Sequence, residues 1–259
     1  MNEAHSPVAL VTGAAGGIGR EVARALVRDG VAVGLLDRPG RALDEVAAEL
    51  AWGGRAKVTA VEADVARAAE VNVAVATVEE RLGPVTQLAC VAGILRPGGL
   101  LTATDGDWAE QFAVNSTGVF HCLRAVARRM VSRRQGAIVV VTSNAAVVPR
   151  QNMIGYAASK AASTALTRGA GLELAAYGIR CNAVLPGSTD TPMQRDLWPD
   201  PVAGASAAVD GEPAAYRVGI PLRRIGAPAD VAELVAFLLS DRARHVTLQT
   251  VAVDGGASL

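Results

Sequence analysis

The stretch VALVTGAAGGIG, residues 8–19, decides the fold of this chain. Its first five residues are apolar or β-branched and predict a buried strand, and the residues from Gly17 onward carry the apolar spacing of a helix. Gly13 permits a tight turn, and Gly17, Ile18 and Gly19 let a pyrophosphate approach the backbone at the helix N-terminus. A glycine-rich turn alone is as often structural as functional, but its position between a strand and a helix predicts a dinucleotide site.

The same rhythm continues through the rest of the chain, where short β-rich runs alternate with longer segments of helical periodicity. The expected strands are Val8–Thr12, Val31–Leu36, Lys57–Glu62, Gln87–Val91, Ala137–Thr142, Arg180–Leu185 and Thr250–Val253. The expected helices are Gly17–Asp29, Arg41–Trp52, Ala66–Leu82, Asp107–Arg134, Gly155–Tyr177 and Pro228–Leu239. This alternation is typical of an α/β fold in which helices cover both faces of a parallel sheet. Because no linker or repeat divides the chain, we expect residues 1–259 to form a single domain.

The composition excludes several classes of protein. Of the 259 residues 51% are apolar, enough for a sizeable core, and 25 basic residues balance 25 acidic ones. The balanced charge provides no global field for nucleic acid or an anionic membrane, and no apolar run approaches the roughly 18 residues of a membrane helix. Cys90, Cys122 and Cys181 lack metal-ligand spacing, and no secretory leader precedes the first strand. We therefore expect a cytoplasmic protein that binds a small molecule and no metal.

Three residues further along the chain predict a reaction. Tyr156 and Lys160 are four residues apart on one face of an expected helix, so the ammonium can favour the ionised phenol. A phenol ordinarily ionises near pH ~10, which is too high for a base at neutral pH without such help. Ser143 follows an expected strand and supplies a hydrogen-bond donor. With a dinucleotide on the glycine turn, these residues predict hydride transfer at an alcohol carbon.

Asp37 bears on which dinucleotide is bound. It closes the second expected strand, where a carboxylate can accept hydrogen bonds from the adenosine ribose and repel a 2′-phosphate, which favours NAD over NADP. The alternative interpretation is an aspartate that only shapes a turn, and the neighbouring Arg38 is a candidate partner for a 2′-phosphate. Asp64 and Val65, after the third strand, are either an adenine contact or a helix cap.

Residues 188–219 interrupt the rhythm. They include four prolines separated mostly by small residues, so regular packing is not expected throughout. The segment follows the carboxyl end of a strand, where open α/β sheets bind their ligands. A loosely specified surface loop is one interpretation, and a lid over the substrate is the one that we favour.

Taken together, these features resemble the classical short-chain dehydrogenase/reductase family across essentially the whole chain. The matching motifs are Thr12–Gly19, Asp64, Ala92-Gly93, Asn115, Ser143, Tyr156–Lys160 and Pro186-Gly187. The resemblance implies a Rossmann-like, doubly wound sheet of seven strands and an assembly that is commonly a homotetramer. One position departs from the family pattern: Cys90 stands where the family has an asparagine that braces the central strands, so we expect a local stability cost.

The resemblance also implies a role for each catalytic position. Tyr156 would be the acid/base, and Lys160 would bind the nicotinamide ribose and lower the pKa of the tyrosine. Ser143 would hold the substrate oxygen, and Asn115 would support a proton relay through water. The candidate NAD contacts are Gly13, Gly17, Ile18, Gly19, Asp37, Asp64, Val65, Ala92, Gly93, Tyr156, Lys160, Pro186, Gly187, Thr189 and Thr191.

A narrower resemblance concerns the substrate. The segments around Ala92–Arg96, Pro149-Arg150, Pro186–Arg195, Gly219–Leu222 and His245–Gln249 are similar to dehydrogenases that oxidise the C3 alcohol of 2,3-dihydro-2,3-dihydroxybenzoate with NAD. Such a cyclic carboxylate needs a cation to orient it. Both Arg96 and Arg150 can supply one, unless they are ordinary solvated arginines, and we favour Arg96. The other candidate substrate contacts are Ser143, Met153, Met193 and Gln194.

Three rival interpretations remain open at this stage. Trans-2,3-dihydro-3-hydroxyanthranilate has an amine in place of a hydroxyl, and its dehydrogenases resemble the same subgroup. An NADPH-dependent 3-oxoacyl thioester reductase is disfavoured by Asp37. A non-catalytic nucleotide-binding protein on this fold is disfavoured because Ser143, Tyr156 and Lys160 are all present.

Overall fold

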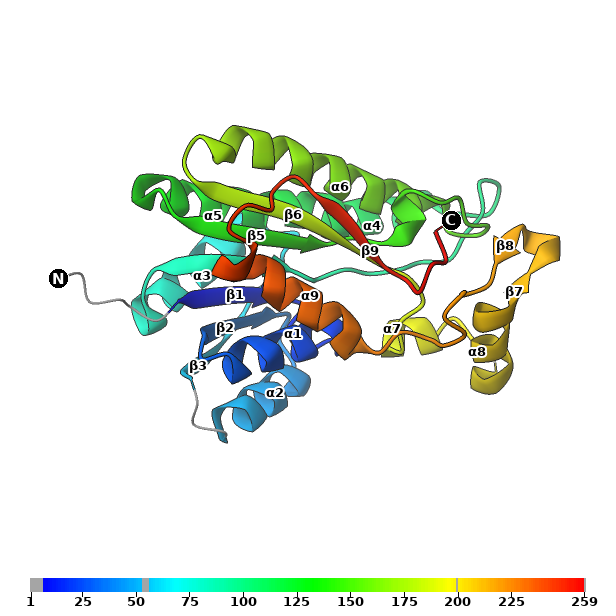
Figure 1. The fold of residues 1–259 in the computed structure, drawn as a ribbon, viewed down its shortest axis with the longest axis horizontal. Helices are drawn as coiled ribbons and strands as arrows, with labels where there is room; N and C mark the ends of the chain where they lie inside the picture. The colour runs from blue at the N-terminus through cyan, green and yellow to red at the C-terminus, as the bar shows by residue number, and fades with distance from the viewer. Residues whose placement is uncertain (1–6, 53–55, 199, 259) are drawn as a thin grey trace.

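The protein is built around one parallel sheet, seen in the computed structural model, which describes residues 7–52, 56–198 and 200–258. Seven strands pair in the order β3-β2-β1-β4-β5-β6-β9 (Figure 1). They are β1 (Val8–Thr12), β2 (Ala32–Asp37), β3 (Val58–Glu62), β4 (Val85–Cys90), β5 (Gly136–Val141), β6 (Ile179–Pro186) and β9 (Thr250–Val253). All neighbouring pairs are parallel, so the strands' carboxyl ends meet at one edge. The predicted α/β class and the seven predicted strands are confirmed, with ends that shift by one or two residues.

Helices cover both faces of the sheet. α1, α2 and α9 pack on one face, and α3, α5 and α6 pack on the other. The helix bounds are α1 (Gly17–Arg28), α2 (Arg41–Trp52), α3 (Ala68–Leu82), α4 (Asp105–Phe112), α5 (Val119–Arg133), α6 (Ile154–Ala175), α7 (Pro192–Arg195), α8 (Pro201–Asp210) and α9 (Pro228–Leu239). Since β1 lies between β2 and β4, the strand order changes direction beside the glycine turn, which is where doubly wound sheets bind their ligands.

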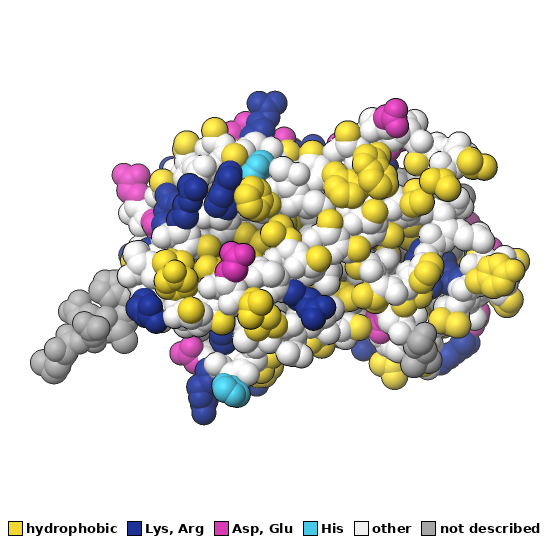
Figure 2. All heavy atoms as spheres, turned by 90° about the horizontal axis from the view of Figure 1, so that it is seen from above, with side chains coloured by type: hydrophobic (Ala, Val, Ile, Leu, Met, Phe, Trp, Pro, Cys, Tyr) yellow, Lys and Arg dark blue, Asp and Glu magenta, His cyan; other side chains and the backbone are white. Residues whose placement is uncertain are grey.

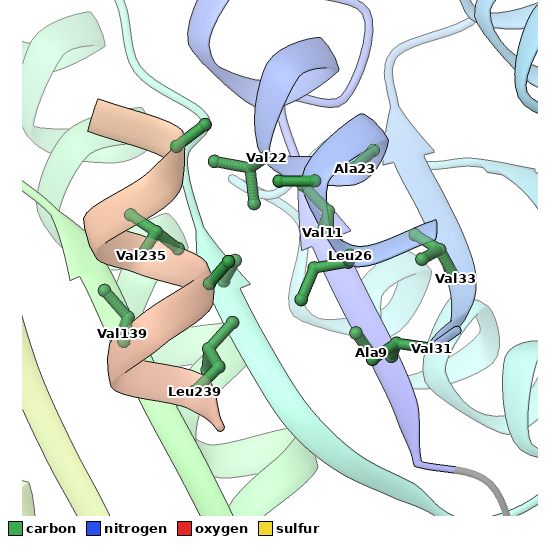
Figure 3. Packing of buried hydrophobic residues seen from close by; sticks show 14 of the residues in the cluster. Ala9, Val11, Val22, Ala23, Leu26, Val31, Val33, Val139, Val235 and Leu239 are labelled. Atoms are coloured by element: carbon green, nitrogen blue, oxygen red, sulfur yellow. The ribbon is translucent and has the colours of Figure 1, made fainter. Parts of the chain in front are cut away.

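The strand sequence divides the core into two apolar clusters. In β1, Ala9 and Val11 point to the α1 and α9 side, whereas Val8 and Leu10 point to the α3 and α5 side. Figure 3 shows the first cluster, in which Val22 and Leu26 of α1 face Val235 and Leu239 of α9 above the sheet. Each fully buried Val or Leu contributes roughly 1.5–3 kcal/mol, so both clusters hold the strand order in place.

The long helix expected over Asp107–Arg134 is confirmed as one helical run, with a π-helical turn in its middle. The structure has α4, then a π-helical turn, η1 (Ala113–Gly118), and then α5. α4 also starts earlier than predicted, since the Thr104 side chain accepts a hydrogen bond from the Asp107 backbone N–H and caps the helix. Apolar periodicity did not indicate the π turn, because one additional residue per turn barely alters the spacing.

The segment 188–219 is more regular than its composition predicts. It contains α7, α8 and a hairpin of two short strands, β7 (Gly211–Glu212) and β8 (Arg217–Val218). Pro192 and Pro201 each stand at the start of a helix, where a proline has no hydrogen bond to lose, and the side chains of Thr191 and Asp200 cap these helices. The expectation of irregular structure was therefore wrong for most of this segment. The segment lies at the carboxyl edge of the sheet (Figure 1), and its role as a lid stays a prediction.

The molecular surface carries mixed side chains. Figure 2 shows one broad face on which apolar side chains are interspersed with basic and a few acidic ones. None of the helices in the described part of the chain is long and apolar enough to span a bilayer. The three cysteines are free and buried.

The glycine turn provides a test of the fold. In Gly19→Ala, the added methyl group would collide with the carbonyl oxygen of Gly13, which is part of the backbone and cannot move aside cheaply. We expect a loss of more than about 2 kcal/mol in the free energy of unfolding. Gly40→Ala is the matched control, since a methyl group there meets no described atom within 4 Å. Urea unfolding of both variants measures the difference, and equal midpoints would contradict the prediction.

Candidate active site

A cavity of about 970 Å³ opens at the carboxyl ends of the strands. All fifteen candidate NAD contacts line it, from Gly13 in the glycine turn to Thr191 at the start of α7. Of the candidate substrate contacts, Ser143, Arg150, Met153, Met193 and Gln194 line it as well, whereas Arg96 does not. The cavity therefore brings together the predicted cofactor residues and three of the predicted catalytic residues, Ser143, Tyr156 and Lys160.

The glycine turn leaves its backbone open to the cavity. Gly13 has φ +68°, and a side chain there would lie 2.7 Å from the backbone of Ala92. α1 begins directly after Gly16. Among the described residues, no side chain caps its N-terminus, and its first turn contains no acidic residue. The first N–H groups of α1 are thus available to an anion. These features fit the pyrophosphate of a dinucleotide.

Asp37, at the end of β2, forms a hydrogen bond with the glycine turn. Its carboxylate accepts hydrogen bonds from the backbone N–H groups of Ala15 at 2.9 Å and Arg38 at 2.8 Å. Asp37 therefore does shape the turn. A contact with the ribose is still possible for it, because each carboxylate oxygen can accept a further hydrogen bond. Asp64 similarly accepts a hydrogen bond from the Ala66 N–H at 2.9 Å while lining the cavity.

Ser143 and Tyr156 meet in the interior of the cavity. Ser143 follows β5, and Tyr156 lies in the first turn of α6 with 8% of its surface exposed. Burial raises the pKa of the Tyr156 phenol, and a hydrogen bond with Ser143 opposes this by lowering it. The phenol is accordingly held in its neutral form, and Ser143 is the one described group that favours its ionised form.

Lys160 lies one helical turn beyond Tyr156 and is 5% exposed. Its Nζ donates a hydrogen bond to the Val141 carbonyl at 3.1 Å and lies 5.8 Å from the centroid of the tyrosine ring. Burial lowers the pKa of Lys160 to about 8. In this structure the ammonium is directed to a backbone carbonyl, and the expected lowering of the tyrosine pKa by Lys160 stays a prediction.

Asn115 lies in the π turn and is fully buried, and it does not line the cavity. Its side-chain oxygen accepts a hydrogen bond from the Ile94 N–H, and its amide donates to the Ile94 carbonyl and to Ser159 Oγ, all at 2.9 Å. Asn115 thus joins the segment after β4 to α6. Its role in a proton relay stays a prediction.

The structure reverses our preference between the two arginines. Arg96 is bound by both carboxylate oxygens of Glu110, at 3.0 and 3.1 Å, on the partly exposed side of α4. Arg150 instead lines the cavity, and its guanidinium donates a hydrogen bond to the Ala257 carbonyl at 3.3 Å. Arg195 is bound to Asp190 and does not line the cavity either. The sequence predicted correctly that the loops carrying Arg96 and Arg150 follow strands at the carboxyl edge of the sheet. It did not indicate that Glu110 of α4 would bind Arg96.

Several lining residues were missed by sequence reasoning. Arg217 of β8, Trp198 after α7 and Ala257 near the C-terminus all line the cavity. Another is Asn144, whose side chain donates to Asp254 at 3.3 Å and so connects the residue after Ser143 to the C-terminal segment. None of them belongs to a periodic pattern or a motif, so only the folded chain brings them to the site.

Cys90 lies behind the site in the apolar cluster under α3 and α5. A hydrogen bond with the Cys122 thiol, together with burial, keeps the pKa of Cys90 well above its usual value. The thiol is therefore neutral and packs as a small apolar side chain. The stability cost expected from losing an asparagine here stays a prediction.

The fold, the glycine turn and the buried Ser143, Tyr156 and Lys160 define a dinucleotide-dependent oxidoreductase of the Rossmann type. The family model of the short chain dehydrogenases matches residues 7–201, and the chain belongs to that family. Membership implies a nicotinamide cofactor, either NAD or NADP.

Curated relatives cover almost the whole chain. It is 45% identical to the 2,3-dihydro-2,3-dihydroxybenzoate dehydrogenase of Bacillus subtilis, over 97% of this chain and 96% of that protein. It is 41% identical to the vibriobactin-specific 2,3-dihydro-2,3-dihydroxybenzoate dehydrogenase of Vibrio cholerae, over 100% and 98% of the two chains. An inactive 2-(S)-hydroxypropyl-CoM dehydrogenase 2 of Xanthobacter autotrophicus is also 41% identical, over 91% and 98%. Identity at this level therefore does not by itself distinguish one substrate from another.

The solved structures agree on the fold. The crystal structure of levodione reductase superimposes with a TM-score of 0.91 at 32% sequence identity, covering 97% of each chain. The sheet order described above is thus the fold of a known short-chain dehydrogenase structure.

The buried lysine generates a prediction about stability. The pKa of Lys160 is about 8 in the folded protein and 10.5 for an ordinary lysine. Below pH 8 the side chain is charged in both the folded and the unfolded protein, so the full cost of burying the ammonium lowers the free energy of unfolding. That cost disappears as pH rises from about 8 through 10.5. Lys160→Met should therefore be more stable than the wild type at pH 7, by on the order of 1–2 kcal/mol after losing the hydrogen bond to Val141.

Urea unfolding without cofactor at pH 7 and near pH 10 measures this difference. We expect the advantage of the Met variant to shrink at the higher pH. A variant that is less stable at pH 7, or an advantage that does not depend on pH, would contradict the buried-charge argument.

Proposed function

We propose that the protein oxidises the C3 alcohol of 2,3-dihydro-2,3-dihydroxybenzoate with NAD and so forms 2,3-dihydroxybenzoate. One observation carries the proposal: Arg150 lines the same cavity as Ser143 and Tyr156, and it has no acidic partner within ion-pair distance among the described residues. A free cation beside the proton-transfer pair suits an alcohol whose ring also bears a carboxylate. The relatives with 45% and 41% identity that act on this diene support the same substrate.

The residues of the chain divide the chemistry between them. Tyr156 acts as the base in its phenolate form: the phenol first gives up its own proton, which the hydrogen bond with Ser143 favours, and the phenolate then accepts the hydroxyl proton of the substrate. Ser143 also holds the substrate oxygen within reach of Tyr156. The pKa of Lys160, about 8, suits a group that relays this proton near neutral pH. The nicotinamide cofactor, when bound, supplies the hydride acceptor. Oxidation is drawn forward because the initial ketone tautomerises to an aromatic ring.

The glycine turn, Asp37 and Lys160 would hold the cofactor. The uncapped N-terminus of α1 offers N–H groups to the pyrophosphate, and Asp37 offers carboxylate oxygens to the adenosine ribose. No base stands at Ala15, next to the turn, where it would favour a 2′-phosphate. These features support NAD over NADP.

The proposal extends to the assembly and its setting. The family resemblance favours a homotetramer in the cytoplasm, and the exposed Phe120 of α5 and Leu172 of α6 are apolar side chains available for a subunit contact.

A direct assay tests the reaction. We expect NADH to form when the purified protein meets NAD and 2,3-dihydro-2,3-dihydroxybenzoate, and to form more slowly with trans-2,3-dihydro-3-hydroxyanthranilate. Tyr156→Phe removes the proton acceptor and should lower kcat by about 10³-fold while the Kd of NADH changes little. Faster turnover of the amine substrate would favour that rival, and substantial activity in Tyr156→Phe would remove the tyrosine from the mechanism. NADH binding without turnover of either diene would favour a non-catalytic protein.

A second test concerns the cofactor. Asp37→Asn keeps one of the two oxygens that accept hydrogen bonds from the Ala15 and Arg38 N–H groups, and it removes the charge that repels a 2′-phosphate. We expect the ratio of kcat/KM for NADP to that for NAD to rise about tenfold. Asp44→Asn is the matched control, because Asp44 is an exposed acid on α2 that does not line the cavity. Wild-type protein that already prefers NADP would overturn the assignment of NAD.

A further inference from the structure

Two arginines reach the same cavity from separate segments. Arg150 lies in the loop between Ser143 and α6, and Arg217 lies on β8 of the hairpin that follows α8. Both side chains are partly buried rather than fully solvated. β8 pairs only with β7, so Arg217 is carried by a short hairpin outside the main sheet.

Neither arginine has an ion-pair partner within 4.0 Å among residues 7–52, 56–198 and 200–258. The other arginines of this region are paired: Arg195 with Asp190, Arg223 with Asp210, and Arg224 with Asp230. Cations that line a cavity without a partner leave positive charge there for a ligand to neutralise.

The acids nearby offset only part of this charge. Glu212 lines the cavity opposite Arg217 in the hairpin, but it is exposed and forms no ion pair with a described residue. Glu110 is bound to Arg96. Asp254 accepts hydrogen bonds from Asn144, Gly256 and Ser258, which are neutral donors, so its carboxylate keeps its charge and partly offsets that of Arg150 without forming an ion pair with it.

The two guanidinium groups are close enough to influence one another. The pKa of Arg150 is lowered mainly by burial and then by the positive charge of Arg217, whereas Asp254 acts in the opposite direction. The Ala257 carbonyl accepts a hydrogen bond from Arg150 and fixes one side of its guanidinium. The remaining N–H groups of Arg150 are available to a ligand.

We propose that Arg150 and Arg217 form one anion subsite, in which Arg217 is the second cation that binds the substrate carboxylate and connects it to the hairpin of β7 and β8. The cyclic carboxylate named as its ligand rests on the proposed function. The pairing of the two arginines rests on the cavity alone. Arg217 is thus a specificity-determining residue that sequence motifs did not indicate.

Binding of two ring compounds tests the subsite without requiring turnover. Isothermal titration calorimetry with saturating NAD compares 2,3-dihydroxybenzoate with catechol, which has the same hydroxyl groups and no carboxylate. Arg217→Gln should raise the Kd of 2,3-dihydroxybenzoate about tenfold and that of catechol less than about twofold. Arg217→Lys keeps the charge and should stay within about threefold of the wild type.

Arg195→Gln is the matched control, since it removes an arginine of the same segment that is bound to Asp190 outside the cavity. We expect no change in either Kd. Arg150→Gln should weaken binding of the carboxylate at least as much as Arg217→Gln does.

The possible results separate this inference from the proposed function. If Arg150→Gln weakens carboxylate binding and Arg217→Gln does not, Arg150 acts alone and the inference is wrong. Equal weakening of catechol and 2,3-dihydroxybenzoate would assign Arg217 to packing and would also overturn it. Carboxylate binding that depends on Arg217, without turnover of the diene, would reject the proposed reaction and keep the subsite. A wild-type protein that binds neither ring overturns both.

Discussion

The parallel pairing of the central strands is the constraint on which the site depends. Because β1, β4, β5 and β6 run in the same direction, the segments that follow them emerge at one edge. The glycine turn, Gly93, Ser143 and Thr189 come from four different crossings of the sheet and line one cavity for that reason. Residues separated by more than a hundred positions become neighbours without any long-range motif that specifies the contact.

Desolvation is the second physical theme of the site. Tyr156 and Lys160 are both nearly inaccessible, and burial favours the uncharged form of each, so it raises the pKa of the phenol and lowers that of the amine. The two pKa values, which are nearly equal for ordinary side chains, therefore move apart, so the phenol holds its proton more firmly than the ammonium does. Ser143 opposes the effect on the tyrosine through a hydrogen bond. The fold therefore shifts the pKa values of Tyr156 and Lys160 mainly by burying them, and the contact with Ser143 opposes this shift at the tyrosine.

Predictions from sequence succeeded where a local rule determines the structure. The strands followed from β-branched runs, and α9 was predicted residue for residue, because its apolar stripe begins at Pro228 and ends where the helix ends. They failed where a tertiary contact decided. The helix around Asn115 was predicted correctly in extent, but its π turn, where the Asn115 side chain bonds to Ile94, was not predicted. The prolines of residues 188–219 predict irregular structure, although Pro192 and Pro201 each begin a helix that the preceding residue caps.

The sequence by itself determined the α/β class, the glycine turn, and the spacing of Ser143, Tyr156 and Lys160, since these depend on residue type and on separations along one strand or helix. Only the tertiary structure decided which cation faces the cavity. Both Arg96 and Arg150 follow a predicted strand, and the sequence favoured Arg96. In the fold, Glu110 of α4 binds Arg96, whereas Arg150 contacts Ala257 and lines the cavity together with Arg217. The physical reason is that an arginine's role depends on the charges around it, and those charges come from segments that only folding brings together.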